Sequence, residues 1–313
     1  DMYKQLKNTR LINNRQIASQ QLYRNLGEIT IIGNAYTSLK NKLPSPYTTK
    51  VKVSVQSQDV LQIAESLVLA DKSKQICIIS NGLELTPGAH YKRGIISTSA
   101  LLFVRTTAAI PINNSVSADY YPLYHHRTLY CREIALIRKS EKYQVEVIDR
   151  SRNVKKRVLK SYHPLFTKKT GFINYHAFSL ICCRPPEKYI MRTLETTDGK
   201  KIVSDSFDGP TTMMLSSKIR NILTTAAMNK QIHLVIAPMG CCSESDANPT
   251  AIAECYRSII YNKSDKWYNR FKTITFATKV VSHEYLKNME ERKKFIERNR
   301  VIENAFKVAF SGN

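Results

Sequence analysis

The sequence predicts an α/β fold whose sheet is at least partly parallel. Residues 50–55 alternate polar and apolar side chains, as a half-exposed strand does, and residues 59–69 carry apolar side chains at helical spacing. Residues 76–80 form a short apolar run that is typical of a strand buried on both faces. A strand, a helix and a second strand in this order favour parallel pairing. A further helix is expected near the N-terminus, at residues 14–26.

The middle of the chain predicts one helix and three more strands. The helix is expected at residues 97–105, and the strands at 129–137, 143–148 and 177–183. The link at 140–142 is short enough for a hairpin between the first two of these strands.

The second half of the chain has the clearest pattern. A helix is expected at residues 217–228, a strand at 232–237, a helix at 249–261 and a strand at 273–277. The start of the helix at 249 is well marked, because Asn248 is a favoured helix cap and proline is tolerated at the first helical position.

The chain has no internal repeat, low-complexity tract or obvious linker. We therefore expect a single domain over residues 1–313, with a basic insertion at about 150–175 and a helical tail at about 282–310. Its hydrophobic content of 42% is enough for a core.

The charge of the chain is strongly positive. It contains 48 Lys and Arg residues against 25 Asp and Glu, which gives a formal net charge of +23 and an isoelectric point near 9.7. Such an excess favours anionic partners, and the alternative is a chain that lysine simply keeps soluble. We favour nucleic acid, or a nucleoprotein or virion-type assembly, as the partner.

One stretch concentrates this charge, because residues 150–175 contain no acidic residue. The basic residues expected to contact nucleic acid are Arg150, Arg152, Lys155, Lys156, Arg157, Lys160, Lys168 and Lys169. Aromatic residues are interleaved with them, as stacking on bases would require: Tyr162, Phe166, Phe172 and Tyr175. The alternative is a solvated loop whose aromatic rings anchor it to the core.

Cysteine usage indicates a reducing compartment. The seven cysteines are an odd number without a close-spaced framework, and Cys77 lies in an apolar run. The vicinal pairs Cys182-Cys183 and Cys241-Cys242 lack the spacing of zinc sites, so we expect neither a metal nor a cofactor. With no signal peptide and no apolar run long enough for a bilayer, the chain is expected to be intracellular without membrane contact. Its place would be cytoplasmic, nuclear or within a virus particle.

The strongest sign of a ligand site is the segment 234–249. An apolar strand runs there into a loop of small residues, which ends at the helix start marked by Asn248. A strand, a small-residue loop and a helix N-terminus form the usual setting for holding a phosphate.

Several segments carry a resemblance in the same order along the chain. They are Ile78-Ile-Ser-Asn-Gly82 with Thr86-Pro-Gly88, Phe178-Ser-Leu-Ile-Cys-Cys-Arg-Pro-Pro186, Lys218-Ile-Arg-Asn-Ile-Leu223 with residues 234–241, and Asn304-Ala-Phe-Lys-Val-Ala-Phe310. Together they resemble the microbial-type poly(ADP-ribose) glycohydrolases (PARG), a branch of the macrodomain-like fold. The resemblance implies a three-layer α/β fold, with a mixed sheet and helices on both faces.

The departures from the family pattern fall on its chemistry. The family cleaves its substrate with two adjacent glutamates on a helix after a glycine loop, and the resemblance places Ser99 and Ala100 there. Neither residue can act as an acid near neutral pH. The phosphate-cradling glycines are also fewer: Gly88-Ala-His90 stands for three glycines, and Gly240-Cys-Cys242 stands for Gly-Cys-Gly. The acidic residues Glu244 and Asp246 follow, and they would repel a diphosphate.

These observations favour a catalytically inactive PARG-like protein that serves as a basic binding or structural component. One alternative is an ADP-ribose or nucleotide-binding macrodomain. The resemblance would then supply its ligand residues: Asn81, Gly88, Gly94, Gly240, Cys241 and Asn248. Another is a remodelled ADP-ribosyl hydrolase that uses His90, the pair His125-His126 or Cys241. A third is pure protein assembly, which exposed Phe295, Phe306 and Phe310 in the tail would support.

Overall fold

A seven-stranded mixed sheet forms the centre of the molecule, in the order β1-β4-β7-β3-β10-β11-β2. The computed structural model describes residues 29–32, 43–70, 75–81, 98–109, 112, 121, 123, 127–149, 154–164, 176–186, 188–241, 247–265, 267–279 and 289–311. The strands of the sheet are β1 (Ile29–Ile32), β2 (Lys52–Gln56), β3 (Ile76–Ser80), β4 (Thr128–Leu136), β7 (His176–Cys183), β10 (His233–Ile236) and β11 (Thr273–Ala277). Neighbours from β7 to β2 are parallel, whereas β4 runs antiparallel to both β7 and β1. The predicted mixed sheet is confirmed.

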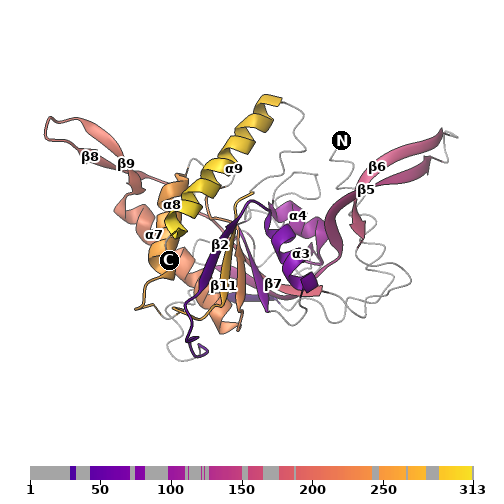
Figure 1. The fold of residues 1–313 in the computed structure, drawn as a ribbon, viewed down its shortest axis with the longest axis horizontal. Helices are drawn as coiled ribbons and strands as arrows, with labels where there is room; N and C mark the ends of the chain where they lie inside the picture. Colours follow the sequence, from indigo (N-terminus) through magenta and orange to yellow (C-terminus); the bar gives the residue numbers. More distant parts are fainter. Residues whose placement is uncertain are drawn as a thin grey trace.

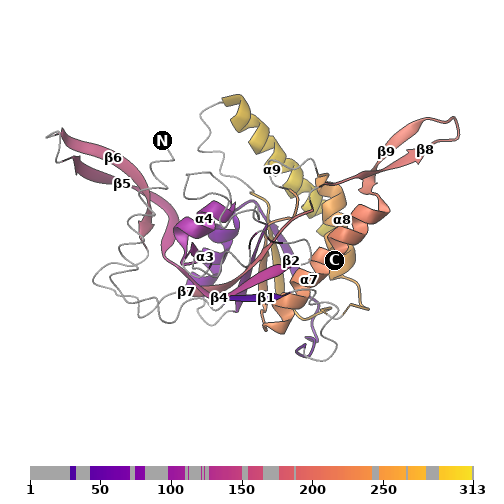
Figure 2. The same ribbon diagram turned by 180° about the vertical axis from the view of Figure 1, so that it is seen from behind.

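Helices cover both faces of this sheet, as predicted (Figures 1 and 2). Helices α3 (Val60–Ala70) and α4 (Thr98–Arg105) pack on one face, and α7 (Gly209–Met228), α8 (Pro249–Ile260) and α9 (Met289–Phe310) pack on the other. Strand β3 shows why its sequence is apolar throughout. Cys77 and Ile79 belong to the core under α7–α9, whereas Ile76 and Ile78 belong to the core under α3 and α4.

Most predicted elements are confirmed within a few residues, and the strands at 76–80 and 273–277 match in full. The tail helix α9 is confirmed from Met289 onward. Strand β1 was not predicted. The helix expected at 14–26 lies outside the described residues.

Helix α7 is longer than expected, since it begins at Gly209 rather than at 217. Its cap is Asp208, whose carboxylate accepts the backbone N–H of Thr211 at 2.8 Å, and a proline lies in the first turn. The first turns of α7 are largely exposed, so they lack the apolar periodicity that predicted the rest of the helix.

The hairpin expected around residues 140–142 is wrong. These residues lie inside one continuous strand, β5 (Arg138–Asp149), which pairs with β6 (Val154–Pro164) rather than with β4. Just before β5 the backbone bonds to the end of α4, where Ile137 N–H donates to Arg105 O at 2.9 Å. Strand β6 also corrects the interpretation of 150–175 as a loop, because residues 154–164 are extended and paired.

A second hairpin was missed altogether. Strands β8 (Met191–Glu195) and β9 (Lys201–Phe207) pair around a tight turn in which Gly199 has a φ of +73°. Gly199 N–H donates to Thr196 O at 2.9 Å, and Thr196 N–H donates to Lys200 O at 2.8 Å. The two hairpins, which we call the β5–β6 arm and the β8–β9 arm, project from opposite ends of the body (Figures 1 and 2).

The tail helix adds aromatic side chains to the core. Phe306 is fully buried, with its ring centroid 4.7 Å from that of Phe276, and Phe295 and Phe310 are half-buried. These rings therefore stabilise the body rather than form an exposed patch. In the described part of the chain, no helix combines the length and hydrophobicity needed to cross a membrane.

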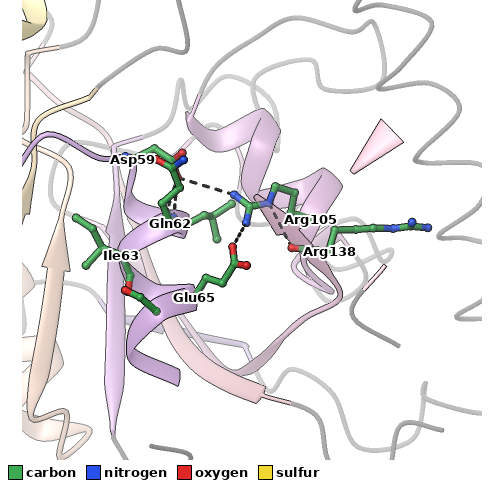
Figure 3. Close-up of polar contacts among 8 residues, drawn as sticks. Asp59, Gln62, Ile63, Glu65, Arg105 and Arg138 are labelled. Atoms are coloured by element: carbon green, nitrogen blue, oxygen red, sulfur yellow. Dashed lines mark hydrogen bonds and ion pairs between the residues drawn. The ribbon is translucent and has the colours of Figure 1, made fainter. Parts of the chain in front are cut away.

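A buried ion-pair cluster joins α3, α4 and the root of β5 (Figure 3). The Arg105 side chain is 1% exposed, and its Nη2 lies 2.6 Å from Oε2 of Glu65. Its Nη1 lies 3.9 Å from Oδ1 of Asp59, and its Nε donates to the backbone carbonyl of Arg138 at 3.3 Å. Asp59 also caps α3 by accepting the backbone N–H groups of Leu61 and Gln62 at 2.9 Å.

We expect Arg105→Met to destabilise the protein by about 3–5 kcal/mol, because it removes the guanidinium that lies 2.6 Å from the buried carboxylate of Glu65. The double variant with Glu65→Met should recover much of this loss. Urea denaturation monitored by circular dichroism measures both effects. The matched control is Arg132→Met, which breaks an exposed pair with Glu133 at 3.6 Å and should cost less than about 1 kcal/mol. Equal losses for Arg105→Met and Arg132→Met would contradict the structural role of the cluster.

Candidate ligand site at the carboxyl edge of the sheet

The carboxyl ends of β7, β3 and β10 lie side by side at one edge of the sheet, because these strands are parallel neighbours. In open α/β sheets, ligands bind outside the carboxyl ends of the strands. Residues Asn81 and Gly240 follow β3 and β10 at this edge, and Asn248 begins α8 beyond the same loop. The structure therefore brings three of the six predicted ligand residues to one edge, and Cys241 lies beside Gly240. Gly88 and Gly94 lie outside the described residues.

Both the nitrogen and the oxygen of the Asn81 side-chain amide form hydrogen bonds. Its Nδ2 donates to the backbone carbonyl of Ala237, and its Oδ1 accepts from Sγ of Cys183 at 3.1 Å. The side chain thus ties β3 to its neighbours β10 and β7 on either side. An incoming ligand would have to compete with both contacts.

Gly240 has a left-handed backbone, with a φ of +75°, in the tight turn that follows β10. Cys241 N–H closes this turn by donating to Pro238 O at 3.2 Å. A Cβ placed on Gly240 would overlap the phenol of Tyr189, which comes from the segment between β7 and β8. The ring of this tyrosine therefore occupies the space that a glycine leaves open beside the backbone. The sequence offered no motif that pointed to Tyr189.

The N-terminus of α8 carries its own cap, as predicted. Oδ1 of Asn248 accepts the backbone N–H of Thr250 at 2.9 Å and that of Ala251 at 3.4 Å. These are first-turn donors of the kind that a phosphate would use at a helix N-terminus. A ligand would have to displace this cap, whose contribution is typically about 1 kcal/mol.

Ala100, which the resemblance places at the second of the family's two glutamates, is part of the core. Ala100 lies in α4 and is 0% exposed, in the same apolar cluster as Ile78. A carboxylate there would be buried among apolar side chains. Ser99 precedes it in α4. The other polar residues singled out in the sequence lie outside the described residues: His90, His125, His126, Glu244 and Asp246.

The cysteines of the described residues are buried thiols. Burial raises the pKa of Cys131 to about 12 and also raises the pKa of Cys77 and Cys255. Cys241 is 0% exposed, which does not suit a nucleophile. The part of the chain that the structure describes contains no cluster of three or more His, Cys, Asp or Glu side chains able to hold a metal ion.

The basic residues that were predicted to bind nucleic acid belong to other segments of the chain than those at this edge of the sheet. Lys155, Lys156, Arg157 and Lys160 lie on β6 of the projecting β5–β6 arm. Arg150, Arg152, Lys168 and Lys169 lie outside the described residues. The arm, residues 138–164, contains nine basic residues against three acidic ones.

A cavity of about 460 Å³ lies at the opposite, amino edge of the sheet, and the sequence did not predict it. Its floor includes Tyr130, Ser179 and Gln231. Their side chains bond one another: Tyr130 Oη lies 3.0 Å from Ser179 Oγ and accepts from Gln231 Nε2 at 3.2 Å. Oε1 of Gln231, by contrast, is buried and has no hydrogen-bond partner among the described residues.

The chain is similar in structure to poly(ADP-ribose) glycohydrolases of two bacteria. One is the Thermomonospora curvata enzyme, at 13% identity and a TM-score of 0.54, with 89% of this chain and 85% of that chain covered. Another is the Deinococcus radiodurans enzyme in complex with ADP-ribose, at 13% identity and a TM-score of 0.55, covering 90% and 93%. A point mutant of the latter enzyme with ADP-ribose gives 13% identity and a TM-score of 0.58, covering 94% and 97%. No family model and no curated protein sequence matches the chain. The PARG macrodomain-like fold is thereby confirmed.

We expect Gly240→Ala to destabilise the protein by about 2–4 kcal/mol, from backbone strain at positive φ together with overlap against Tyr189. Gly199→Ala is the matched control, since Gly199 has a φ of +73° but no atom within 4 Å of an added Cβ. That control should cost about 1 kcal/mol in urea denaturation. Tyr189→Ala should reduce the penalty at Gly240 to the control value. A penalty unchanged by Tyr189→Ala would show that this side chain does not fill the space over the glycine.

We expect the six described cysteines to resist 5,5′-dithiobis(2-nitrobenzoate) at pH 8 in the folded protein and to react fully in guanidinium chloride. Burial hides these thiols, and for Cys77, Cys131 and Cys255 a pKa above the ordinary value also leaves little thiolate at this pH. The Cys242→Ser variant removes the seventh cysteine, which lies outside the described residues. Rapid reaction of one thiol in this variant, abolished by Cys241→Ser, would restore Cys241 as a candidate nucleophile.

Proposed function

We propose that this protein, which has the fold of the poly(ADP-ribose) glycohydrolases, is a non-catalytic binding component of a nucleoprotein assembly. It would hold nucleic acid by its basic surface, chiefly by the β5–β6 arm. The single observation that carries the proposal is that the candidate ligand residues already make contacts within the protein. Asn81, Gly240 and Asn248 already contact other atoms of this chain where a nucleotide would need them.

The absence of an acid at the family position supports the loss of catalysis. Cleavage of a glycosidic bond needs a carboxylic acid to protonate the leaving group. Ala100 supplies none, and its complete burial means that the neighbouring core has closed around a methyl group. A glutamate at this position would have to displace apolar neighbours before it reached a substrate.

The dimensions of the β5–β6 arm suit duplex nucleic acid. Strand β5 has 12 residues, and an extended strand of that length spans about 40 Å. One turn of duplex rises about 34 Å, and its major groove admits a two-stranded β ribbon. Without Arg138, which is 1% exposed, the sequence of the arm still has an excess of five positive charges, which favours the phosphate backbone.

A second candidate function is recognition of ADP-ribose without cleavage. It is favoured by the strand–loop–helix arrangement at the carboxyl edge and by the likeness to enzymes solved with ADP-ribose. The two candidates differ in their response to salt. Binding through several phosphates weakens steeply as salt rises, whereas a ligand enclosed in a cleft depends on salt much less.

We expect the protein to bind a fluorescent 20-base-pair duplex in anisotropy titrations with a steep salt dependence between 50 and 200 mM NaCl. Replacing Lys155, Lys156, Arg157 and Lys160 by Gln should weaken binding at least tenfold at 100 mM NaCl. It should also reduce the log–log salt slope by about two or more, because each lost phosphate contact removes about one unit. The charge-matched control replaces the exposed residues Lys263, Lys293, Lys294 and Arg300 by Gln and should change the slope less.

The same protein is then titrated with ADP-ribose by calorimetry and incubated with poly(ADP-ribose). We expect no heat of binding at 1 mM ligand and no release of ADP-ribose. Saturable ADP-ribose binding that ignores salt, without duplex binding, would replace the proposal with the second candidate. Release of ADP-ribose would contradict both.

A further inference from the structure

The cavity at the amino edge of the sheet plays no part in the proposed function. It is bounded by the bulge of β4, by the amino ends of β3 and β7, and by the turn that joins α7 to β10. Its volume of about 460 Å³ lies within the range of cavities that bind small molecules. Within the described part of the chain, its lining belongs neither to the β5–β6 arm nor to the carboxyl edge of the sheet. A ligand here would therefore be separate from both candidate functions considered above.

Two residues that line the cavity have a left-handed backbone although they carry side chains. Glu133 has a φ of +56°, and Lys230 has a φ of +55°. Among the described residues, the only other non-glycine residue of this kind is Asn269, and asparagine tolerates the conformation well. Such backbone strain is unfavourable and tends to persist at binding and catalytic sites. The strain therefore marks this cavity as a candidate site.

A β-bulge brings two opposite charges to the mouth of the cavity. In β4, Arg132 and Glu133 together lie opposite the single residue Ser179 of β7. Neighbours in a regular strand point to opposite faces, whereas these two residues both line the cavity. Nε of Arg132 lies 3.6 Å from Oε1 of Glu133, and both side chains are exposed. This contact leaves the Nη groups of Arg132 and the second oxygen of Glu133 available to a ligand, and Lys230 adds an exposed cation.

The floor of the cavity has one hydroxyl proton without an acceptor. Tyr130 Oη accepts a hydrogen bond from Gln231 Nε2 at 3.2 Å and lies 3.0 Å from Ser179 Oγ. The two hydroxyl groups carry two protons, of which one lies in the hydrogen bond between them. Burial is the main cause that raises the pKa of Tyr130, so its phenol keeps its proton at neutral pH. Among the described residues the second proton meets no acceptor, so it can be donated to a ligand.

The carboxamide of Gln231 supplies the matching acceptor. Both protons of its Nε2 are used, because they are donated to Tyr130 Oη at 3.2 Å and to the backbone carbonyl of Asn229 at 2.9 Å. These bonds fix which end of the carboxamide is the oxygen. Oε1 is buried and has no partner in the described part of the chain, which is unfavourable. The last side-chain torsion of glutamine is soft, so a small rotation presents Oε1 to a molecule in the cavity.

A primary carboxamide is the ligand group that complements this floor. Its oxygen accepts the unused hydroxyl proton, and its NH₂ group donates to Oε1 of Gln231. The C-terminus of α7 favours the same orientation, because its last residue, Met228, lines the cavity and helix C-termini carry partial negative charge. A carboxylate in the same place would have no proton to donate and would add a negative charge there.

We propose that the cavity binds a free α-amino acid with a carboxamide side chain, glutamine or asparagine. The carboxamide lies on the floor, against Gln231 and the hydroxyl pair of Tyr130 and Ser179. At the mouth, the carboxylate of the ligand binds Arg132 and its ammonium group binds Glu133, so each charge of the zwitterion meets its opposite. This site is independent of nucleic-acid binding by the β5–β6 arm.

Isothermal titration calorimetry with L-glutamine and L-asparagine tests the proposal. We expect saturable binding of at least one of them, with a Kd below about 1 mM. The corresponding acids, L-glutamate and L-aspartate, have nearly the same shape. They should bind about tenfold more weakly or worse, because their side chains cannot donate a hydrogen bond to Oε1 of Gln231.

Variants at the mouth test the two charge contacts. Arg132→Gln and Glu133→Gln should each weaken the binding by about fivefold or more, because each removes one charge that faces the zwitterion. The matched controls, Arg192→Gln and Glu195→Gln, remove the same charges from exposed positions of the β8–β9 arm and should leave the binding unchanged. Thermal unfolding checks that each variant is folded, as the exposure of the replaced side chains leads us to expect.

The absence of saturable binding of either amide up to about 10 mM would overturn the proposal. So would equal binding of the amides and the acids, or binding that Arg132→Gln and Glu133→Gln leave unchanged. The quadruple glutamine variant of the β5–β6 arm should keep full amino-acid binding. Failure of this proposal and failure of the proposed function are therefore distinguishable.

Discussion

A guanidinium with 1% exposure is tolerated inside a protein only where carboxylates and carbonyls accept its hydrogen bonds. Arg105 meets this demand with Glu65 and Asp59 from α3 and with the carbonyl of Arg138 from β5. This requirement fixes the position of α4 against α3, because sliding either helix by one turn would separate the buried guanidinium from its carboxylates. It also fixes the point at which the chain leaves the sheet, so the direction of the β5–β6 arm is set by the core.

The sequence predicted the buried parts of the fold well, for a physical reason. Strands β3 and β11 are covered on both faces and therefore appear as apolar runs, and Asn248-Pro249 marks the start of α8 by its own chemistry. The β8–β9 arm was missed because exposed strands do not need apolar residues. Asn81, Gly240 and Asn248, which the resemblance named as ligand residues, lie at one edge of the sheet, and their role in binding stays a prediction. Tyr189 was not foreseen, since its contact with Gly240 is tertiary and leaves no local pattern.

The two arms divide the charge of the molecule unequally. The β5–β6 arm has nine basic and three acidic residues, whereas the β8–β9 arm has three of each. The β8–β9 arm contributes only its end residues Met191 and Phe207 to the described core, so the sequence between them can change without disturbing it. The body then acts as a rigid spacer that holds a strongly basic surface and a neutral, partly apolar one at opposite ends (Figures 1 and 2). This separation allows the two surfaces to serve different partners.

The contact between Tyr189 and Gly240 bears on how the fold can evolve. While the phenol occupies the space over the glycine, mutations elsewhere on the loop gain nothing for a ligand that must approach the same backbone. Removing the tyrosine alone leaves a void beside a left-handed residue and lowers stability before any new binding can be selected. A path from this loop to one that binds a phosphate therefore crosses a less stable intermediate. Descendants of this chain should diversify the β8–β9 arm more readily than they gain a ligand at this loop.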